Sequence, residues 1–295
     1  MIYENGNVWK AAKHKKVLLF AMSGLGKTHV SSMLRNDGDW FHYSVDYRIG
    51  TRYMGEHIVD NFKKAAMSVP FLADLLRSDS ISIASNISFE NLAPLSTYLG
   101  KPGDVARGGI PFDFYCKRQD QHHAAEQAAL LDTPAFIERA QNLYGYQNFV
   151  CDSGGSICEV VDPWDKTDQV MTSLSENLLM VWIASNEAHT AELVRRFNKS
   201  PKPMCYQPAF LLSSWEKYQS ETGLSPDKDS TYQRPHHFRC TSLPNRPERS
   251  TVASTSAVLY YHNTTQAPKS VSHCRHSIRS VHCSIADSSP QPPSL

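Results

Sequence analysis

"VLLFAMSGLGKTHVSSML", residues 17–34, runs from four apolar residues through a turn with two glycines into a segment with helical spacing. The turn has the spacing of the phosphate-binding pattern G-x-x-x-x-G-K-[ST], with Ala21 in place of the first glycine. Alanine adds only a methyl group at this position when its φ is negative. The stretch therefore predicts a strand, a phosphate-binding loop and a helix over 28–35, in that order.

The residues of this loop have the chemistry that phosphate binding requires. Backbone N–H groups at the start of a helix attract an anion, and glycine permits the backbone conformations that turn these groups inward. Lys27 would reach the β- and γ-phosphates of a nucleotide, and the Thr28 hydroxyl would bind Mg²⁺. The expected nucleotide-binding residues are Ser23, Gly24, Leu25, Gly26, Lys27, Thr28 and His29. The alternative is a glycine-rich turn that ends in Gly-Lys-Thr by chance.

Apolar runs alternate with amphipathic stretches over residues 1–223, which is typical of a parallel sheet covered by helices. The predicted strands are 16–21, 40–46, 81–85, 147–152 and 178–184. We expect an α/β fold, a three-layer α/β/α domain with a mainly parallel five-stranded sheet.

Start and stop signals predict two further helices. Thr133-Pro134 is typical of an N-cap followed by a first helical residue, and Gly145 would end that helix. A second helix is expected over 208–222, and the Gly- and Pro-containing segment 101–115 is expected to be a loop.

Composition indicates a globular protein without a nucleic-acid or membrane partner. The 30 Lys and Arg residues nearly balance 29 Asp and Glu residues, and 41% of the residues are apolar. No apolar stretch approaches the roughly 18 residues that a membrane-spanning helix needs, and residues 1–16 lack the apolar core of a secretory signal. The seven cysteines are scattered, which argues against a disulfide framework. We therefore expect a cytoplasmic protein.

Residues 14–210 resemble the small-molecule kinase branch of the P-loop NTPases, which includes shikimate and gluconate kinases. The phosphate-binding loop of those kinases is typically G-x-x-G-x-G-K-[ST], which is close to AMSGLGKT here. Residues 15–56 and 148–197 are also similar to a bacterial group labelled ATPase. The resemblance implies ATP and Mg²⁺ as ligands and transfer of the γ-phosphoryl group to a small acceptor.

The resemblance also implies roles for two carboxylates that follow strands. Asp46 lies where those kinases have an acid that orients the substrate hydroxyl, although Arg48 replaces their usual second acid. Asp152 ends the NFVCD strand, where a Walker B acid would hold Mg²⁺, and the Ser-Gly-Gly turn 153–155 would contact the substrate. Asp46 could instead cap the helix that follows it.

Two later segments fit the same pattern. Residues 181–197 are similar to the strand and helix that carry the lid arginine, which makes Arg195 and Arg196 candidates for closing over the transferred group. Both could instead be basic residues at the end of a helix, where the helix dipole favours them. Lys202-Pro203-Met204 resembles a segment near the adenine site.

Arg118, His122, His123 and Glu126 form a group that includes metal-ligating residue types. His122 and Glu126 are four residues apart and share a helical face. Two ligands on one face are too few for a metal site, so we expect a solvated helix face instead.

The composition changes after Gly223, and residues 224–295 are dominated by Ser, Thr, Pro, His, Arg and Cys. Such a segment buries too little apolar surface to offset the entropy of ordering, so we expect a low-complexity tail, disordered or translated from a shifted frame. Its histidines and cysteines match no common zinc-binding spacing; they include His273, Cys274, His276, His282 and Cys283.

Taken together, these features predict an ATP-dependent phosphotransferase with a small-molecule acceptor. Lys27, Asp46, Asp152 and Arg195 or Arg196 would carry catalysis, with Thr28 and Asp152 on the metal. The alternative is an ATPase or nucleotide-dependent switch that acts on a protein partner. A kinase needs an acceptor pocket between residues 46–60 and 104–126, whereas a switch needs an exposed partner surface there.

Truncation after Gly223 should leave a folded domain that still binds ATP, because the last predicted helix ends there and the following residues are too polar to contribute a core. Circular dichroism and calorimetric ATP titration of the truncated chain would check this. An insoluble product, or one that no longer binds ATP, would mean that residues 224–295 complete the domain. A gene whose other two frames close soon after codon 223 would count against the shifted-frame origin.

Overall fold

The computed structural model describes residues 3, 5–103, 105, 108–162, 165–199 and 204–222. Lys202, Pro203, Gly223 and the predicted tail 224–295 lie outside the described residues.

The fold is α/β, with a parallel sheet whose strand order is β2-β3-β1-β4. The strands are β1 (Lys16–Phe20), β2 (Trp40–Ser44), β3 (Asn148–Asp152) and β4 (Leu179–Trp182). They confirm four of the predicted strands. β1 lies between β3 and β4, so the loop that follows β1 emerges from the middle of the sheet.

The predicted strand over 81–85 is wrong. In the structure these residues form an extended segment outside the four-stranded sheet, between helices α5 (Pro70–Arg77) and α6 (Ala93–Leu99). Successive residues of the segment, ISIAS, alternate between half-buried and exposed. Alternation indicates an extended chain with one covered side, and it does not specify a hydrogen-bonded partner strand.

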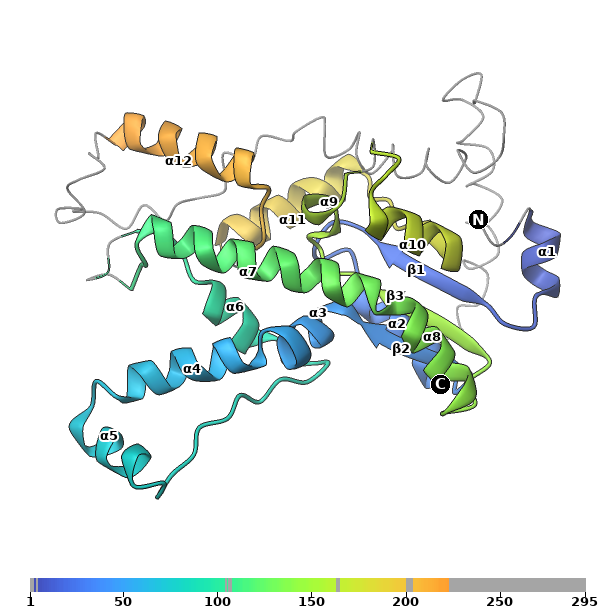
Figure 1. Cartoon of the computed structure of the whole chain (residues 1–295). Coiled ribbons are helices and arrows are strands. Elements are labelled where there is room, and N and C mark those ends of the chain that lie inside the picture. Colours follow the sequence, from blue (N-terminus) through green and yellow to red (C-terminus); the bar gives the residue numbers. More distant parts are fainter. Residues whose placement is uncertain are drawn as a thin grey trace, which may run out of the picture.

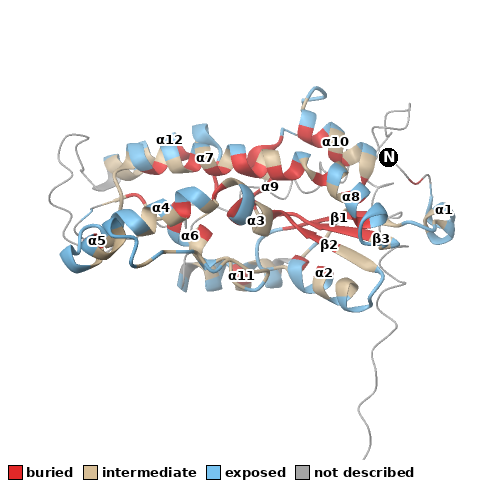
Figure 2. Ribbon diagram, turned by 60° about the horizontal axis from the view of Figure 1, so that its bottom comes forward, coloured by how far each residue is buried: buried red, intermediate tan, exposed pale blue. Residues whose placement is uncertain are grey.

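Helices cover both faces of the sheet (Figures 1 and 2). Val17 and Leu19 of β1 pack with Leu34 of α2 (Lys27–Asn36) on one face. Leu18 and Phe20 point to the other face and belong to the main core. That face is covered by α7 (Phe112–Leu131), α8 (Thr133–Asn142) and α10 (Gln169–Asn177).

The remaining helices extend the carboxyl end of the sheet and its flanks. After β2 the chain forms α3 (Val45–Arg48), the π-helix η1 (Ile49–Tyr53) and α4 (Gly55–Ala66), and α4 and α5 project away from the sheet (Figure 1). The other elements are α1 (Gly6–Ala11), α9 (Ile157–Val160), α11 (Glu187–Lys199) and α12 (Pro208–Thr222).

The helix predictions are confirmed with local corrections. α12 has the predicted bounds, and Gly145 takes φ +73° just after α8 ends. Thr133 is the first residue of α8 rather than its N-cap, because only Asp132 separates α8 from α7 and the Thr133 hydroxyl donates to the Leu130 carbonyl at 2.6 Å. The expected loop 101–115 is shorter in the structure, because α7 begins at Phe112 with Pro111 as its N-cap.

The described cysteines and helices relate to the predictions about disulfide bonds and membrane-spanning segments. Cys116, Cys151, Cys158 and Cys205 are free thiols, and Cys151 is fully buried in the core. Within the described residues, none of the helices combines the length and apolar character that a membrane crossing requires.

Candidate functional site

Both glycines of the loop between β1 and α2 have left-handed backbone conformations. Gly24 and Gly26 take φ values of +89° and +86°, which only glycine adopts without strain. Among the described non-glycine residues, Asp79 alone has a positive φ, so Ala21 has the negative φ at which a methyl group is tolerated. α2 begins at Lys27, which places the free N–H groups of its first turn beside the loop.

Lys27 lies beneath the loop with only 7% of its surface exposed. Its ammonium group donates to the carbonyl oxygens of Ala21 at 3.0 Å and Met22 at 3.4 Å. Burial lowers the pKa of Lys27, and the negative charges of Asp152 and Asp46 oppose that shift. The loop therefore surrounds a buried cation that two neighbouring carboxyl groups stabilise.

A cavity of about 280 Å³ opens above this cation. Its lining joins the loop to the ends of β2 and β3: Ser23, Gly24, Gly26, Lys27, Thr28, Asp46, Ser153 and Gly155. The predicted nucleotide-binding residues Leu25 and His29 lie outside this lining, Leu25 half-buried and His29 exposed. The cavity brings together polar groups from three segments that are far apart in the sequence.

Asp46 lies in the first turn of α3 and faces this cavity. The alternative that Asp46 caps α3 is wrong, because the Ser44 hydroxyl accepts the hydrogen bond from the Tyr47 N–H at 3.3 Å. Burial, with the nearby negative charge of Asp152, raises the pKa of Asp46 to about 6. Asp46 thus titrates near neutral pH at the edge of the cavity.

Arg48 has a structural role in place of the second acid. Its Nε donates to the Asp132 carboxylate at 2.8 Å, and its guanidinium lies 4.9 Å from the centre of the Phe136 ring. Arg48 therefore ties α3 to the start of α8.

Asp152 is the last residue of β3, paired in register with Leu19 of β1. This register puts its buried carboxylate near Lys27, at the same edge of the sheet as the loop, although Asp152 is not among the residues that line the cavity. The Asp152 carboxylate lies 3.5 Å from His42 Nε2 of β2, and neither ring nitrogen of His42 has a hydrogen-bond partner among the described residues. The local sequence does not predict that His42 is a neighbour of this acid.

The Ser-Gly-Gly turn after β3 packs directly against the loop. The Ser153 hydroxyl donates to the Leu19 carbonyl at 2.9 Å, and a Cβ on Gly155 would lie 3.1 Å from the Ser23 Cβ. A Cβ on Gly154 would lie 2.7 Å from Asp46 Oδ1 and 3.0 Å from Glu126 Oε1. Glycine at 154 therefore allows these two carboxyl groups to approach the turn.

Arg195 and Arg196 lie on the exposed side of α11, and neither lines the cavity. Both guanidinium groups bind Glu192, at 2.6 Å for Arg195 and 2.7 Å for Arg196. The same helix nevertheless contacts the loop, since a Cβ on Gly24 would lie 3.0 Å from Leu193 Cδ2. The helix is adjacent to the site, and its two arginines are held by Glu192, one turn earlier on the same helix.

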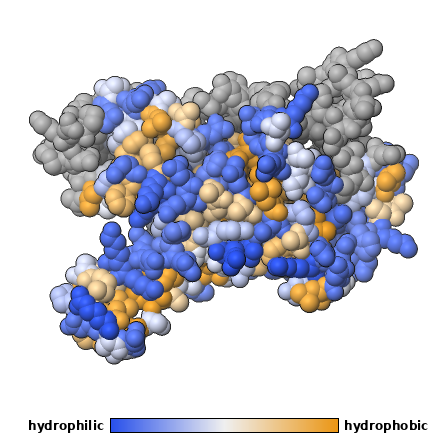
Figure 3. All heavy atoms as spheres, viewed as in Figure 1, coloured by the Kyte–Doolittle hydropathy of each residue, from blue (hydrophilic) through white to orange (hydrophobic). Residues whose placement is uncertain are grey.

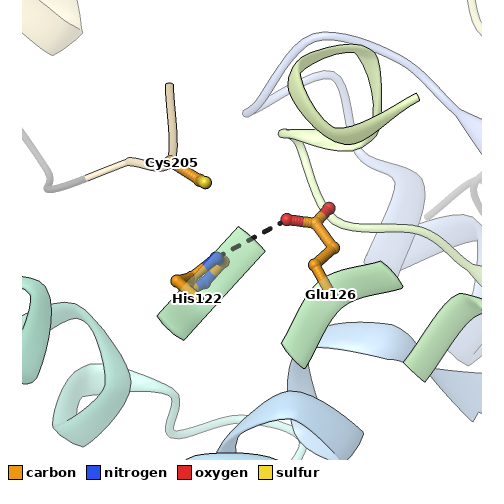
Figure 4. A group of neighbouring side chains, drawn as sticks. All are labelled: His122, Glu126 and Cys205. Atoms are coloured by element: carbon orange, nitrogen blue, oxygen red, sulfur yellow. Dashed lines mark ion pairs between the residues drawn. The ribbon is translucent and has the colours of Figure 1, made fainter. Parts of the chain in front are cut away.

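The expectation of a solvated face at His122 and Glu126 is wrong. His122 is 4% exposed and Glu126 is fully buried, because this side of α7 is covered by the rest of the domain. Cys205, 1% exposed, lies next to them, and one donor atom from each of the three side chains lies within 4.8 Å of the others (Figure 4). Burial lowers the pKa of His122 to about 4 and raises that of Glu126 to about 8.

The chain matches no protein-family model, no curated protein and no solved structure. Any functional conclusion therefore depends on the chemistry and geometry of the residues at the carboxyl edge of the sheet.

Gly154→Ala should destabilise the fold by about 1–3 kcal/mol, because the added methyl group must displace the Asp46 or Glu126 carboxyl group from a packed site. Urea unfolding of both proteins would measure this difference. Gly6→Ala is the matched control, since a Cβ at Gly6 meets nothing within 4 Å. Equal stability of Gly154→Ala and the parent protein would contradict the close approach of these carboxyl groups.

Proposed function

We propose that this protein binds ATP with Mg²⁺ and transfers the γ-phosphoryl group to a small hydroxylated acceptor. The observation that carries the proposal is the cavity in which a glycine-containing loop, the buried Lys27 ammonium and Asp46 meet at the start of α2. Loop N–H groups, a lysine and strand-end acids are the groups that phosphoryl-transfer sites use.

The hydrogen bonds that Lys27 makes to the loop support the proposal that it binds a nucleotide. Its two partners, at 3.0 and 3.4 Å, are neutral loop carbonyls, which phosphate oxygens would replace as stronger, charged acceptors. The first-turn N–H groups of α2 would bind the same phosphates. The Thr28 hydroxyl lines the cavity and Asp152 ends the neighbouring strand, so these two residues would hold Mg²⁺. The ion would neutralise negative charge on the phosphate oxygens.

Asp46 suits the role of general base for the acceptor. Its carboxyl group faces the cavity, and a pKa of about 6 lets it accept a proton near neutral pH. In the proposed step the acceptor hydroxyl oxygen bonds to the γ-phosphorus as its proton passes to Asp46. The bond between the γ-phosphorus and the bridging oxygen breaks, and ADP leaves. Arg195 or Arg196 could stabilise the transferred group only after releasing Glu192.

An ATPase or nucleotide-dependent switch with a protein partner is the second candidate. It is favoured by exposed apolar side chains around α5, outside the predicted stretches 46–60 and 104–126, where Met67, Val69 and Phe71 are 39%, 45% and 70% exposed. Figure 3 shows apolar surface at this end of the molecule. Such a surface is typical of an interaction site.

ADP release, measured with and without a library of small hydroxylated metabolites, separates the two functions. Release that depends on one class of acceptor, with a phosphorylated product in equal amount, supports the kinase. Release at the same rate without any acceptor supports the ATPase.

Lys27→Ala should weaken ATP binding and lower turnover about 100-fold or more, because it removes the cation that the loop presents to the β- and γ-phosphates. Calorimetry and a coupled ADP assay would measure the two effects. Lys63→Ala is the control, since Lys63 is a half-exposed lysine on α4. Unchanged affinity and turnover in Lys27→Ala would overturn the phosphate-binding assignment.

Asp152→Asn should lower turnover about 100-fold while changing nucleotide affinity much less, since it removes charge from the metal position and leaves the phosphate-binding loop intact. Turnover should be measured over a range of Mg²⁺ concentrations. Equal turnover of the two proteins at saturating Mg²⁺ would assign Asp152 a purely structural role.

A further inference from the structure

A second group of donor side chains lies beside the cavity and has no part in the proposed phosphoryl transfer. His122 and Glu126 project from successive turns of α7, and Cys205 projects toward them from the segment that leads into α12 (Figure 4). His122 Nδ1 lies 3.7 Å from Glu126 Oε2, and the donor atoms of all three residues lie within 4.8 Å of one another.

The position of Cys205 is fixed by the backbone on both of its sides. Gln119, one turn before His122 on α7, donates from its side-chain amide to the Met204 carbonyl at 2.9 Å. The same side chain accepts the Tyr206 N–H at 2.9 Å. Gln119 thus holds the two neighbours of Cys205 against α7 and aims the thiol at His122 and Glu126.

Two buried polar atoms in this group are left without a hydrogen bond. Among the described residues, His122 Nδ1 and Glu126 Oε1 have no hydrogen-bond partner although both side chains are more than nine-tenths buried. A buried polar atom without a partner costs about 1–3 kcal/mol. His122 Nδ1 faces Glu126 Oε2 and the Cys205 thiol, so an ion bound between them would give this nitrogen the partner that it lacks, whereas Glu126 Oε1 points toward Gly154.

We propose that His122, Glu126 and Cys205 bind a Zn²⁺-type divalent ion, separate from the Mg²⁺ of the nucleotide. An imidazole nitrogen, a thiolate sulfur and a carboxylate oxygen are the ligands that Zn²⁺ prefers, whereas Mg²⁺ prefers oxygen ligands alone. Neighbouring nitrogen and oxygen ligands of tetrahedral Zn²⁺ are about 3.3 Å apart, close to the 3.7 Å between His122 and Glu126.

The charge and outer contacts of the group also suit this ion. One thiolate and one carboxylate balance the two positive charges, and both side chains release their protons to solvent as the ion binds. The Ser156 hydroxyl donates to Glu126 Oε2 at 2.6 Å and would orient that carboxylate. The ion would fasten the start of α12 to α7 and hold Glu126 next to Gly154.

The test is metal analysis of the purified full chain, followed by titration of chelator-treated protein with Co²⁺ as a spectroscopic probe. We expect a single ion per chain and a thiolate-to-cobalt absorption band that Zn²⁺ abolishes. Cys205→Ser should remove the band, and Ser156→Ala should weaken binding about 10–100-fold. Cys116 is a half-buried cysteine on α7, the helix that carries His122 and Glu126. The variant Cys116→Ser should retain the band.

The cysteines of residues 224–295 require a separate control, because they could bind Co²⁺ on their own. The triple variant Cys240→Ser, Cys274→Ser and Cys283→Ser should bind Co²⁺ like the parent protein. Absence of the band in the parent protein, its retention in Cys205→Ser, or its loss in the triple variant would overturn the proposal. ATP affinity, measured on the same samples, reports on the nucleotide site independently, so the two proposals fail separately.

Discussion

The buried ammonium group of Lys27 constrains the whole carboxyl edge of the sheet. A cation with only 7% of its surface exposed must be compensated by hydrogen bonds and negative charge, because the protein interior solvates it poorly. Two loop carbonyls supply the hydrogen bonds. Asp152 and Asp46 supply most of the compensating charge, one from the end of β3 and the other from just after β2. The parallel sheet brings these groups together because its strand ends share one edge.

The negative charge that the Lys27 ammonium requires explains why acids are concentrated at this edge of the sheet, although burial disfavours their charged forms. Asp46 is raised in pKa by burial and by Asp152, so it is less acidic than an exposed aspartate. The turn after β3 can approach these acids only because residue 154 carries no side chain. The compact turn formed by Ser153, Gly154 and Gly155 then closes one wall of the cavity. Charge, chain geometry and cavity shape at this edge therefore depend on one another.

Sequence reasoning worked where the pattern was local. The strand, loop and helix around Lys27 are contiguous, and the strand-end acids follow from the rule that parallel strands end at one edge. The strand expected at 81–85 is wrong because a short apolar run does not identify a pairing partner. Asp132, and not Thr133, is the N-cap of α8, because only Asp132 separates α7 from α8 and periodicity cannot resolve so short a gap.

The burial of the polar residues of α7 is the feature that the sequence predicts least well, although their spacing indicates a buried face. Tyr115, Gln119, His122, Glu126 and Ala129 alternate by four and three residues, the spacing of a single buried stripe. The local sequence predicts a solvated face for the polar side chains of that stripe because their partners, above all residues 204–206, lie about 80 positions later in the chain.

Glu126 lies between the cavity next to Asp46 and the proposed metal site at His122 and Cys205. Its Oε1 atom lies beside Gly154, the residue that Asp46 also approaches, while its Oε2 atom accepts from Ser156 and faces His122. A displacement of Glu126 toward either side must change the packing on the other, because the side chain is fully buried and has no open space to move into. A ligand that fixes Glu126 from the side of His122 and Cys205 therefore also fixes the wall of the cavity next to Asp46.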